Sequence, residues 1–378
     1  MKKNYRKEII SKTKRLVVKV GTGVITTKDG LLDMTQVASI SRQAVGLRRR
    51  GYEVAVVSSG AVGAGMGELG MRKRPTTLPE IQAAAAVGQS KLIGAYDDCF
   101  KMEGYHAAQI LLTREDLEGR HRYLNTCNTI SALFGLKVIP VINENDTVSV
   151  EEISFSDNDA LSVLVANLLR AELLVMLSSV DGLYRRPDKG AELIPLVEEI
   201  TADIEGLASR SKTHLGMGGM ESKLRAARIA TNSGEAVIIA NGREPDVLIK
   251  IMEGEELGTL FIPVREKLTS RKRWIGFTLR PKGKIYVDDG AYDALSKRGK
   301  SLLASGITAV DGDFERGDVV SVFATGNNTE FARGLTNYSS TELMKIQGQS
   351  STSIKRILGS KPYDEVVHRD NMVLIQIL

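Results

Sequence analysis

The fold class is decided by RLVVKVGTG at residues 15–23 and YEVAVVSSG at residues 52–60. Each segment opens with a short run of aliphatic residues, which is typical of a buried strand, and closes on a glycine-containing turn. Between them, Met34–Arg50 has the apolar spacing of a helix, which is expected to stop at Gly51. A strand, a helix and another apolar strand in this order indicate a parallel sheet covered by helices on both faces.

The same alternation continues to about Ile262. Further strands are expected at residues 105–113, 137–143, 172–179 and 235–241, and further helices at Ala160–Arg170 and Met220–Ser233. Residues 1–263 are therefore predicted to form an α/β domain with a mainly parallel sheet sandwiched between helices. In such folds, ligands bind beyond the carboxyl ends of the strands.

The character of the chain changes after Arg280. Residues 281–378 contain short strands separated by Gly and Asp turns, which is typical of a small β-rich barrel or sandwich. Residues 264–280 contain six Lys or Arg against one Glu, and we interpret this basic segment as a linker. The prediction is thus two domains, 1–263 and 281–378, joined by residues 264–280.

Composition excludes several classes of protein. With 378 residues, 42% hydrophobic and 26% charged, the chain is globular and large enough for two domains. No apolar stretch reaches the roughly 20 residues needed to span a bilayer, and the N-terminus is a poor secretion signal, so a cytoplasmic location without membrane association is expected. Two cysteines, Cys99 and Cys127, cannot supply a disulfide framework or a cysteine-rich zinc site.

The net charge of +5 does not describe the folded bodies. Residues 1–15 carry seven Lys or Arg against one Glu, the linker is also basic, and residues 281–378 hold twelve charges of each sign. The basic balance therefore belongs to a tail and a linker, and it gives no argument for nucleic-acid binding.

Two separate lysine–glycine sites suggest that the chain binds phosphate. Lys19 lies at the end of an apolar strand, just before Gly21-Thr22-Gly23, where backbone N–H groups can approach an anion. Lys223 lies in the first turns of a helix that follows Gly218-Gly219. The alternatives are a solvated lysine before an ordinary turn and a flexible loop followed by a surface lysine.

Carboxylates and amides gather between these two sites. PVINENDTVSVEE (140–152) follows a strand and FSDNDA (155–160) precedes a helix, and both are positions where a parallel sheet collects ligand groups. The residues concerned are Asn143, Asn145, Asp146, Asp157, Asn158 and Asp159. Loop and helix-cap roles are the alternative for each, but two clusters beside two lysine–glycine sites favour a functional role.

One glycine pattern is a competing signal. GMGELG (65–70) fits the dinucleotide pattern G-x-G-x-x-G, but Gly65 lies well beyond the strand end at Ser58, where that fingerprint does not belong. A nicotinamide enzyme is therefore the weaker interpretation. The chain also lacks the G-x-x-x-x-G-K-[ST] motif of P-loop ATPases.

These segments together resemble a known family. VVKVGTG, VVSSGAVGAG, AAVGQSKLI, ILLTREDLEGRHRYLN, VIPVINENDTV, SDNDALS, SSVDGLY and GMGGMESK occur in the order seen in the glutamate 5-kinases of the amino acid kinase family. RKRWIGF and FERGDVVSV resemble the linker and the C-terminal PUA domain of those enzymes. The resemblance covers residues 15–370 and implies an amino acid kinase fold followed by a PUA-like domain.

The resemblance also implies roles for single residues. Lys19, Asp159 and Lys223 match the catalytic positions, with Asp159 organising the two lysines, and Ser59, Asp146 and Asn158 match the glutamate ligands. Among these ligands, Asp146 is expected to attract the ammonium group, and Ser59 and Asn158 are expected to donate hydrogen bonds to carboxylate oxygens. The expected nucleotide-binding residues are Lys19, Gly21, Ser178, Ser179, Met217, Gly218, Gly219, Met220, Glu221, Ser222 and Lys223. The chain departs from many relatives at Ser178-Ser179, where they have Thr-Asp, and from others at Met217, where they have Thr.

The implied reaction is ATP-dependent phosphorylation of the γ-carboxylate of L-glutamate, the first step of proline biosynthesis. ATP and Mg²⁺ are the implied cofactors, no protein residue is assigned to the metal, and a homo-oligomer (dimer or tetramer) with feedback inhibition by proline is expected. Two alternatives stay open, which are RNA binding or modification through the PUA-like domain and phosphorylation of another small carboxylate.

Overall fold

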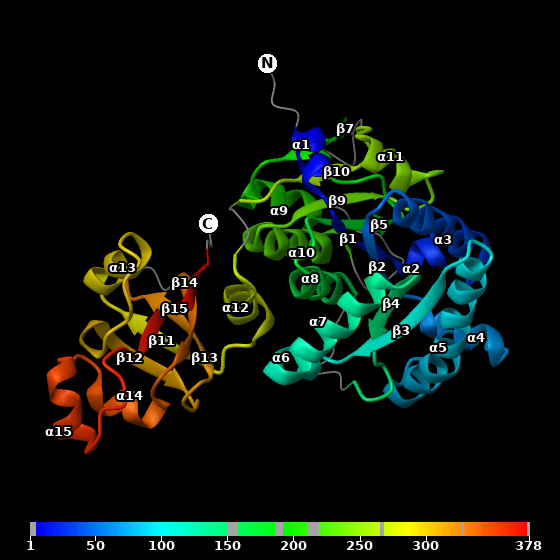
Figure 1. The fold of residues 1–378 in the computed structure, drawn as a ribbon. Coiled ribbons are helices and arrows are strands. Elements are labelled where there is room, and N and C mark those ends of the chain that lie inside the picture. The colour runs from blue at the N-terminus through cyan, green and yellow to red at the C-terminus, as the bar shows by residue number, and fades with distance from the viewer. Residues whose placement is uncertain are drawn as a thin grey trace. The chain divides into compact units, whose positions relative to one another are not determined.

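A computed structural model describes residues 5–149, 158–185, 192–209, 219–264, 268–326 and 329–375. The chain forms two compact units, Met1–Lys267 and Leu268–Leu378 (Figure 1). In the described part of the chain, no helix is long and apolar enough to cross a membrane.

Unit 1 is built on an eight-stranded sheet with the strand order β3-β4-β2-β1-β5-β9-β10-β8. Neighbouring strands are parallel except for β10, which runs antiparallel to β9. The strands are β1 (Arg15–Val20), β2 (Glu53–Ser58), β3 (His106–Leu112), β4 (Val138–Glu144), β5 (Leu173–Ser178), β8 (Leu196–Val197), β9 (Ala236–Asn241) and β10 (Thr259–Phe261). A short hairpin joins β6 (Tyr184–Arg185) and β7 (Glu192–Leu193). The predicted mainly parallel sheet is confirmed.

Helices cover both faces of this sheet (Figure 1). One layer contains α3 (Met34–Arg49) and α5 (Leu78–Lys101), and the other contains α8 (Asn158–Leu169) and α10 (Met220–Ser233), which pack together. The remaining helices are α1 (Tyr5–Lys12), α2 (Thr22–Ile25), α4 (Ala61–Glu68), α6 (Arg114–Glu118), α7 (Arg120–Gly135), α9 (Ala202–Ser209) and α11 (Val247–Glu253).

Strand alternation in β1 directs one lysine toward the α8 layer. Leu16, Val18 and Val20 belong to the core cluster that includes side chains of α3 and α5. Because successive residues of a strand point to opposite faces, Lys19 points to the other face, where α8 packs against β1. The sheet thereby holds a charged side chain at a position that is only 3% exposed.

The first glycine of the rejected dinucleotide motif serves helix packing. Gly65 lies inside α4, and a Cβ there would lie 1.8 Å from the carbonyl oxygen of Ala84 in α5. A Cβ on Gly88 of α5 would lie equally close to the carbonyl oxygen of Ala61. Only glycine allows α4 and α5 to approach this closely, so this pattern is explained by packing and not by a dinucleotide.

Unit 2 contains a five-stranded mixed sheet with the order β12-β11-β13-β14-β15. Its strands are β11 (Gly283–Val287), β12 (Ile307–Gly312), β13 (Val319–Ala324), β14 (Thr329–Thr336) and β15 (Val367–Leu374). The helices α13 (Asp289–Ser296), α14 (Ser340–Ile346) and α15 (Ile354–Leu358) complete the unit. A separate core runs through it, so the prediction of a second, β-rich body is confirmed.

The boundary between the two units lies inside the segment 264–280 that was predicted to be a linker, because unit 2 begins at Leu268. In the structure, α12 (Ser270–Arg273) and the π-helix Trp274–Thr278 belong to unit 2. Ile275 and Phe277 are buried there, and the carbonyl oxygen of Gly276 accepts a hydrogen bond from Arg333. The linker was predicted from the basic residues of this segment. Its apolar residues Ile275 and Phe277 are the ones that pack into unit 2.

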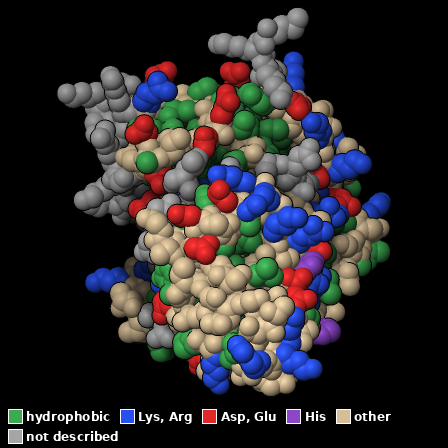
Figure 2. Space-filling view, turned by 90° about the vertical axis from the view of Figure 1, so that its left-hand side faces the viewer, with side chains coloured by type: hydrophobic (Ala, Val, Ile, Leu, Met, Phe, Trp, Pro, Cys, Tyr) green, Lys and Arg blue, Asp and Glu red, His purple; other side chains and the backbone are tan. Residues whose placement is uncertain are grey.

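Positive and negative side chains are interspersed on the face of the molecule shown in Figure 2. Within unit 2, local ion pairs join charges of opposite sign, such as Lys297 with Asp293 at 2.8 Å and Lys282 with Asp318 at 3.1 Å.

Candidate active site

A buried charged cluster lies between the sheet and the α8 layer. Lys19 Nζ lies 2.6 Å from one carboxylate oxygen of Asp159, and Lys223 Nζ lies 3.2 Å from the other. Asp159 is fully buried, and the two lysines are 3% and 6% exposed. Two lysines that are 204 positions apart in the chain thus meet on one carboxylate, the one that the family resemblance implies as their partner.

Each member of this charged cluster comes from a different element. Lys19 is near the carboxyl end of β1, Asp159 is in the first turn of α8, and Lys223 is in the first turn of α10. A carboxylate is stabilised near the positive end of a helix, whereas a lysine there is disfavoured unless a negative charge lies close by. Asp159 lies near the positive end of α8, and its negative charge lies close to Lys223 near the positive end of α10. The three side chains together carry two positive charges and one negative charge. This arrangement is suited to bind an anion such as a phosphoryl group.

The glycine loop after β1 lies beside the end of β5. The N–H group of Gly21 donates to the carbonyl oxygen of Leu177 at 3.0 Å, and a Cβ on Gly21 would lie 3.0 Å from the same oxygen. A Cβ on Gly23 would lie 3.5 Å from Cβ of Ser179, which is exposed next to the buried Ser178. The structure therefore brings together the glycine loop and the two serines predicted to bind nucleotide.

Arg243, in the turn after β9, makes hydrogen bonds to the same loop. Its guanidinium donates to the carbonyl oxygen of Thr26 at 2.7 Å and to that of Gly23 at 3.4 Å, and it pairs with Asp33 at 3.3 Å. The neighbouring Gly242 packs directly on α2, because a Cβ there would lie 2.5 Å from a methyl group of Val24. The sequence analysis missed Arg243, since an arginine in a turn carries no signal of its target.

The start of α10 supplies the other predicted nucleotide residues. Gly219 is the N-cap of α10 and makes no side-chain cap hydrogen bond. Met220 is buried, Glu221 is exposed, and Ser222 is half-buried. The predicted residues Met217 and Gly218 lie outside the described part of the chain.

A network of neutral side chains surrounds the N-terminal residue of α8. Asn158 Nδ2 lies 3.0 Å from Ser59 Oγ, 3.0 Å from Asn143 Oδ1 and 3.2 Å from the carbonyl oxygen of Ser58. Two predicted acceptor-substrate ligands, Ser59 and Asn158, are therefore in contact. Asn143 belonged to the predicted cluster without a role, and the structure shows that it joins β4 to this network.

The direction of the Asn158 amide changes its expected role. A backbone carbonyl can only accept, so the contact with Ser58 requires that Nδ2 faces the protein. The two Nδ2 hydrogens are then shared among three protein acceptors, which leaves Oδ1 as the group that can meet a substrate. We expected Asn158 to donate to a substrate carboxylate, whereas this geometry makes it an acceptor.

Asp146 follows β4 at the same edge of the sheet. Burial, followed by the negative charge of Glu144, raises the pKa of Asp146 to about 6. In the described part of the chain, no hydrogen bond or ion pair joins Asp146 to Ser59 or Asn158. The structure thus places Asp146 at the correct edge without bringing it into this network.

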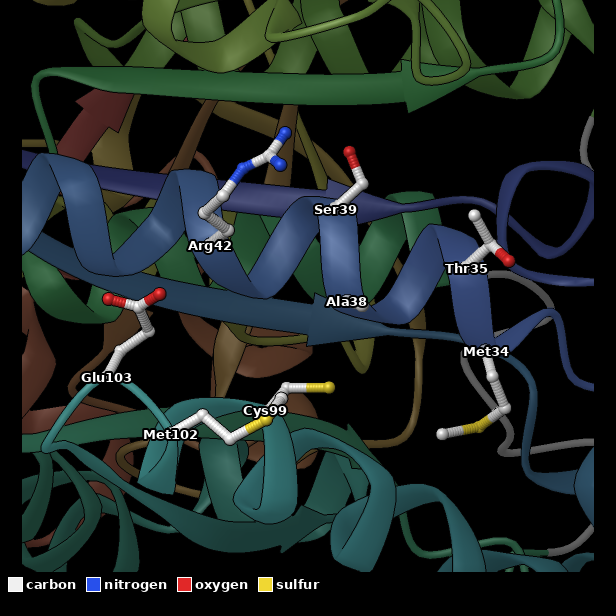
Figure 3. Close-up of a pocket in the computed structure, with 8 residues that line it drawn as sticks. All are labelled: Met34, Thr35, Ala38, Ser39, Arg42, Cys99, Met102 and Glu103. Carbon is white, nitrogen blue, oxygen red and sulfur yellow. The ribbon is translucent and has the colours of Figure 1, made fainter.

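Two cavities of the described structure differ in their position relative to the predicted site residues. One of about 290 Å³ opens at the carboxyl ends of β3 and β4, and its walls include Thr113 and Asn145, the neighbour of Asp146. Another, of about 690 Å³, lies between α3 and the C-terminal end of α5 (Figure 3). Its lining includes Met34, Cys99 and Met102 and none of the predicted site residues.

The described residues do not form a protein-held magnesium site. Mg²⁺ prefers carboxylate and water oxygens, and Asp159 is the carboxylate of the charged cluster. Each of its oxygens lies within 3.2 Å of a lysine nitrogen. Across the described ranges, no group of three or more His, Cys, Asp or Glu side chains is placed to hold a metal. We therefore derive no step through a metal ion.

Comparison with known proteins agrees with this geometry. Residues 14–241 match the amino acid kinase family and residues 283–358 match the PUA domain. The chain is 50% identical over 373 residues to the glutamate 5-kinase of Geobacter sulfurreducens and 48% identical over 373 residues to that of Pelobacter propionicus. Each alignment covers 98% of this chain and 100% of the relative.

A solved carbamate kinase from Giardia lamblia also matches 67% of this chain and 99% of its own, with a TM-score of 0.47 and 18% identity. The assignment rests on the sequence relatives and not on this likeness. The chain belongs to the amino acid kinase family and, within it, to the glutamate 5-kinases that carry a C-terminal PUA domain.

Proposed function

We propose that this chain transfers the γ-phosphoryl group of ATP to the γ-carboxylate of L-glutamate. The observation that carries the proposal is the convergence of Lys19 and Lys223 on the buried carboxylate of Asp159. A cluster of this kind suits a reaction in which two anions must be brought together. The names of the full-length relatives support glutamate as the acceptor.

The chemistry requires charge stabilisation more than proton transfer. An oxygen of the γ-carboxylate attacks the γ-phosphorus, the bond from that phosphorus to the bridging oxygen breaks, and ADP leaves. A glutamate carboxyl group has a reference pKa of about 4.3 and is already ionised, so no general base is needed. Lys19 and Lys223 offset the repulsion between the two anions and the charge on the transferring group, and Asp159 orients both lysines.

The neutral network is proposed to bind the parts of glutamate that do not react. The Ser59 hydroxyl accepts from Asn158, so its own hydrogen is available to a substrate carboxylate. Asn158 Oδ1 and the Asp146 carboxylate are acceptors suited to the α-ammonium group. With a pKa of about 6, Asp146 is mostly ionised at neutral pH and can attract this charge.

Three further properties are proposed because the resemblance implies them. We expect the chain to form a homo-oligomer and to be inhibited by L-proline, and we expect Mg²⁺ to accompany ATP. Light scattering, proline titration of the initial rate, and the rate as a function of Mg²⁺ concentration would test these points.

RNA binding through unit 2 is the less favoured alternative. The relatives that match over the full length are named as kinases, and residues 281–378 have no net charge. A salt-dependent gel-shift assay of the full chain with RNA should show no affinity at physiological salt.

A substrate panel tests the proposed function. The full-length protein is incubated with ATP, Mg²⁺ and glutamate, aspartate, N-acetylglutamate or carbamate, and ADP release is measured. Acyl phosphate is trapped separately with hydroxylamine. We expect glutamate to give the highest kcat/KM and a hydroxamate product. ADP release that does not depend on glutamate, or that prefers another acceptor, would overturn the proposal.

A further inference from the structure

Gln89 lies behind the neutral network and has no assigned role. It is on α5, its side chain is 8% exposed, and its Oε1 accepts a hydrogen bond from Asn143 Nδ2 at 2.9 Å. Asn143 in turn accepts from Asn158 Nδ2 at 3.0 Å. A chain of three amides therefore connects a buried residue of α5 to the N-terminus of α8.

The direction of every amide in this chain follows from one backbone group. The carbonyl oxygen of Ser58 requires the Nδ2 of Asn158 to face the protein. Asn143 must then present Oδ1 to Asn158, which turns its own Nδ2 toward Gln89. Gln89 consequently presents Oε1 to Asn143, and its Nε2 points away. A flip of any one amide would set two donors or two acceptors against each other.

This direction leaves Gln89 with an unsatisfied donor. Within the described ranges, the buried Nε2 of Gln89 has no hydrogen-bond partner. A buried donor without a partner costs free energy, so Gln89 does not serve stability alone. A methionine of similar shape would fill the same space without this cost, but it would leave Asn143 without its acceptor.

Packing against α4 and a hydrogen bond to β2 fix the position of α5 relative to the neutral network. Gly65 and Gly88 allow α4 and α5 to touch. Two turns after Gln89, the hydroxyl of the fully buried Tyr96 lies 3.0 Å from Ser58 Oγ. The same helix therefore fixes both Ser58, at the end of β2, and Asn143, at the end of β4.

We propose that Gln89 is a positioning residue of the acceptor-substrate site, which accepts a hydrogen bond from Asn143 and thereby holds Asn143, and through it Asn158, in the orientation that the Ser58 carbonyl requires. The proposal rests on the proposed function, in which Asn158 Oδ1 meets the acceptor substrate. Gln89 itself stays behind the network and does not touch the reacting atoms.

The test compares Gln89→Met with a matched buried glutamine. Gln43 on α3 is 1% exposed, and its Oε1 accepts from the N–H group of Leu248 at 2.8 Å, away from the site. Gln89→Met should raise the KM for glutamate about three- to tenfold, as expected for one misplaced hydrogen bond, with kcat and the KM for ATP within about twofold. Its Tm should fall no further than that of Gln43→Met, because it exchanges the unpartnered Nε2 of Gln89 for an Asn143 Nδ2 that has lost its acceptor. Gln43→Met also removes the acceptor of a buried N–H group, and it should leave all kinetic constants unchanged.

A conservative variant and the wild-type panel complete the design. Gln89→Glu keeps an acceptor oxygen for Asn143 and should return the KM for glutamate toward the wild-type value. An unchanged KM in Gln89→Met, a lowered Tm with all kinetic constants affected alike, or an unfolded protein would overturn the proposal. The Gln89 and Gln43 variants are compared with the acceptor that the wild-type protein prefers in the substrate panel. If that acceptor is not glutamate, the proposed function fails, and the role of Gln89 is still tested.

Discussion

Asn158 and Asp159 are consecutive residues in the first turn of α8, yet they belong to two regions of opposite physical character. Asp159 holds two lysine ammonium groups within 3.2 Å in a fully buried cluster. Asn158 belongs to a neutral network in which an amide and a hydroxyl make hydrogen bonds of 3.0 Å. Two adjacent residues of one helical turn thus belong to a region of concentrated charge and to a region of directional hydrogen bonds.

The difference indicates how the two regions act. Buried charge is costly, and it is useful where charge moves during a reaction, because its effect is greatest at the transition state. A neutral network gives direction at low electrostatic cost and suits groups whose charge stays constant. We therefore expect the charged cluster to determine kcat and the neutral network to determine the KM for glutamate.

Among the substitutions considered for single residues of the site, removal of one lysine from the charged cluster should lower activity the most. Lys223→Ala should lower kcat by about 10²–10³, as removal of a transition-state donor does elsewhere, with a modest change in the KM for glutamate. Arg225→Ala is the control, since Arg225 is on the same helix and its side chain is 68% exposed. Steady-state kinetics measures both, and an unchanged kcat in Lys223→Ala would remove this lysine from the reaction.

Loss of the Asp146 charge, at the same edge of the sheet as the neutral network, should affect binding instead. Asp146→Asn keeps the shape of the side chain but removes the charge that attracts the ammonium group. We expect a rise of about ten- to hundredfold in the KM for glutamate, which corresponds to about 1.5–3 kcal/mol for a charge-assisted bond. The KM for ATP should stay nearly constant, and a variant that changes only ATP kinetics would contradict our placement of Asp146.

The raised pKa of Asp146 predicts a pH dependence of the same step. Above its pKa of about 6 the carboxylate is charged and attracts the ammonium group, and below it the carboxyl is neutral. In the wild-type protein, kcat/KM for glutamate should therefore fall about tenfold per pH unit below about pH 6. The Asp146→Asn protein should lack this fall, and the same fall in both proteins would assign the titration to another group.

Much of the charged cluster could be predicted because its signals are strong. A lysine between valines in a strand, as at Lys19, is unusual unless it is paired, and the strand–helix alternation determines which helix faces it. The prediction of Asp159 as the partner drew on the family resemblance, since loop spacing does not show that α8 and α10 meet. Sequence patterns therefore indicated the charges, and the fold supplied the contacts.

The neutral network was harder to predict for a physical reason. Hydrogen-bond direction depends on which amide atom faces which neighbour, and residue types do not encode it. Asn158 was expected to donate to substrate, and only the Ser58 carbonyl reveals that it presents an acceptor. Gln89 lies in an alanine-rich helix and within AAVGQSKLI, a segment that carries the family resemblance, but nothing in this segment points to Asn143 as its partner.

A smaller effect on kinetics is expected for Arg243, which makes hydrogen bonds to the glycine loop after β1 and is not itself a predicted nucleotide ligand. Arg243→Ala removes hydrogen bonds to the carbonyl oxygens of Gly23 and Thr26, but the side chain is 40% exposed and water can replace part of them. We expect a rise of about three- to tenfold in the KM for ATP, with the KM for glutamate unchanged. Arg42→Ala, which breaks an exposed ion pair with Asp246, is the control. Equal changes in both KM values would show that Arg243 supports the whole site and not the nucleotide loop.

The most direct test of the division between the two regions compares Asn158→Ala with Asp159→Asn by steady-state kinetics, with ATP and glutamate varied in turn. The two substitutions are adjacent in the chain and at the same turn of α8, so general damage to the helix would affect both alike. We expect Asn158→Ala to raise the KM for glutamate about tenfold and to change kcat only a few-fold. Asp159→Asn should lower kcat at least about a hundredfold with little change in the KM for glutamate. If both variants lose kcat equally, or if Asp159→Asn changes only the KM for glutamate, the separation into a charged region for chemistry and a neutral region for binding is wrong.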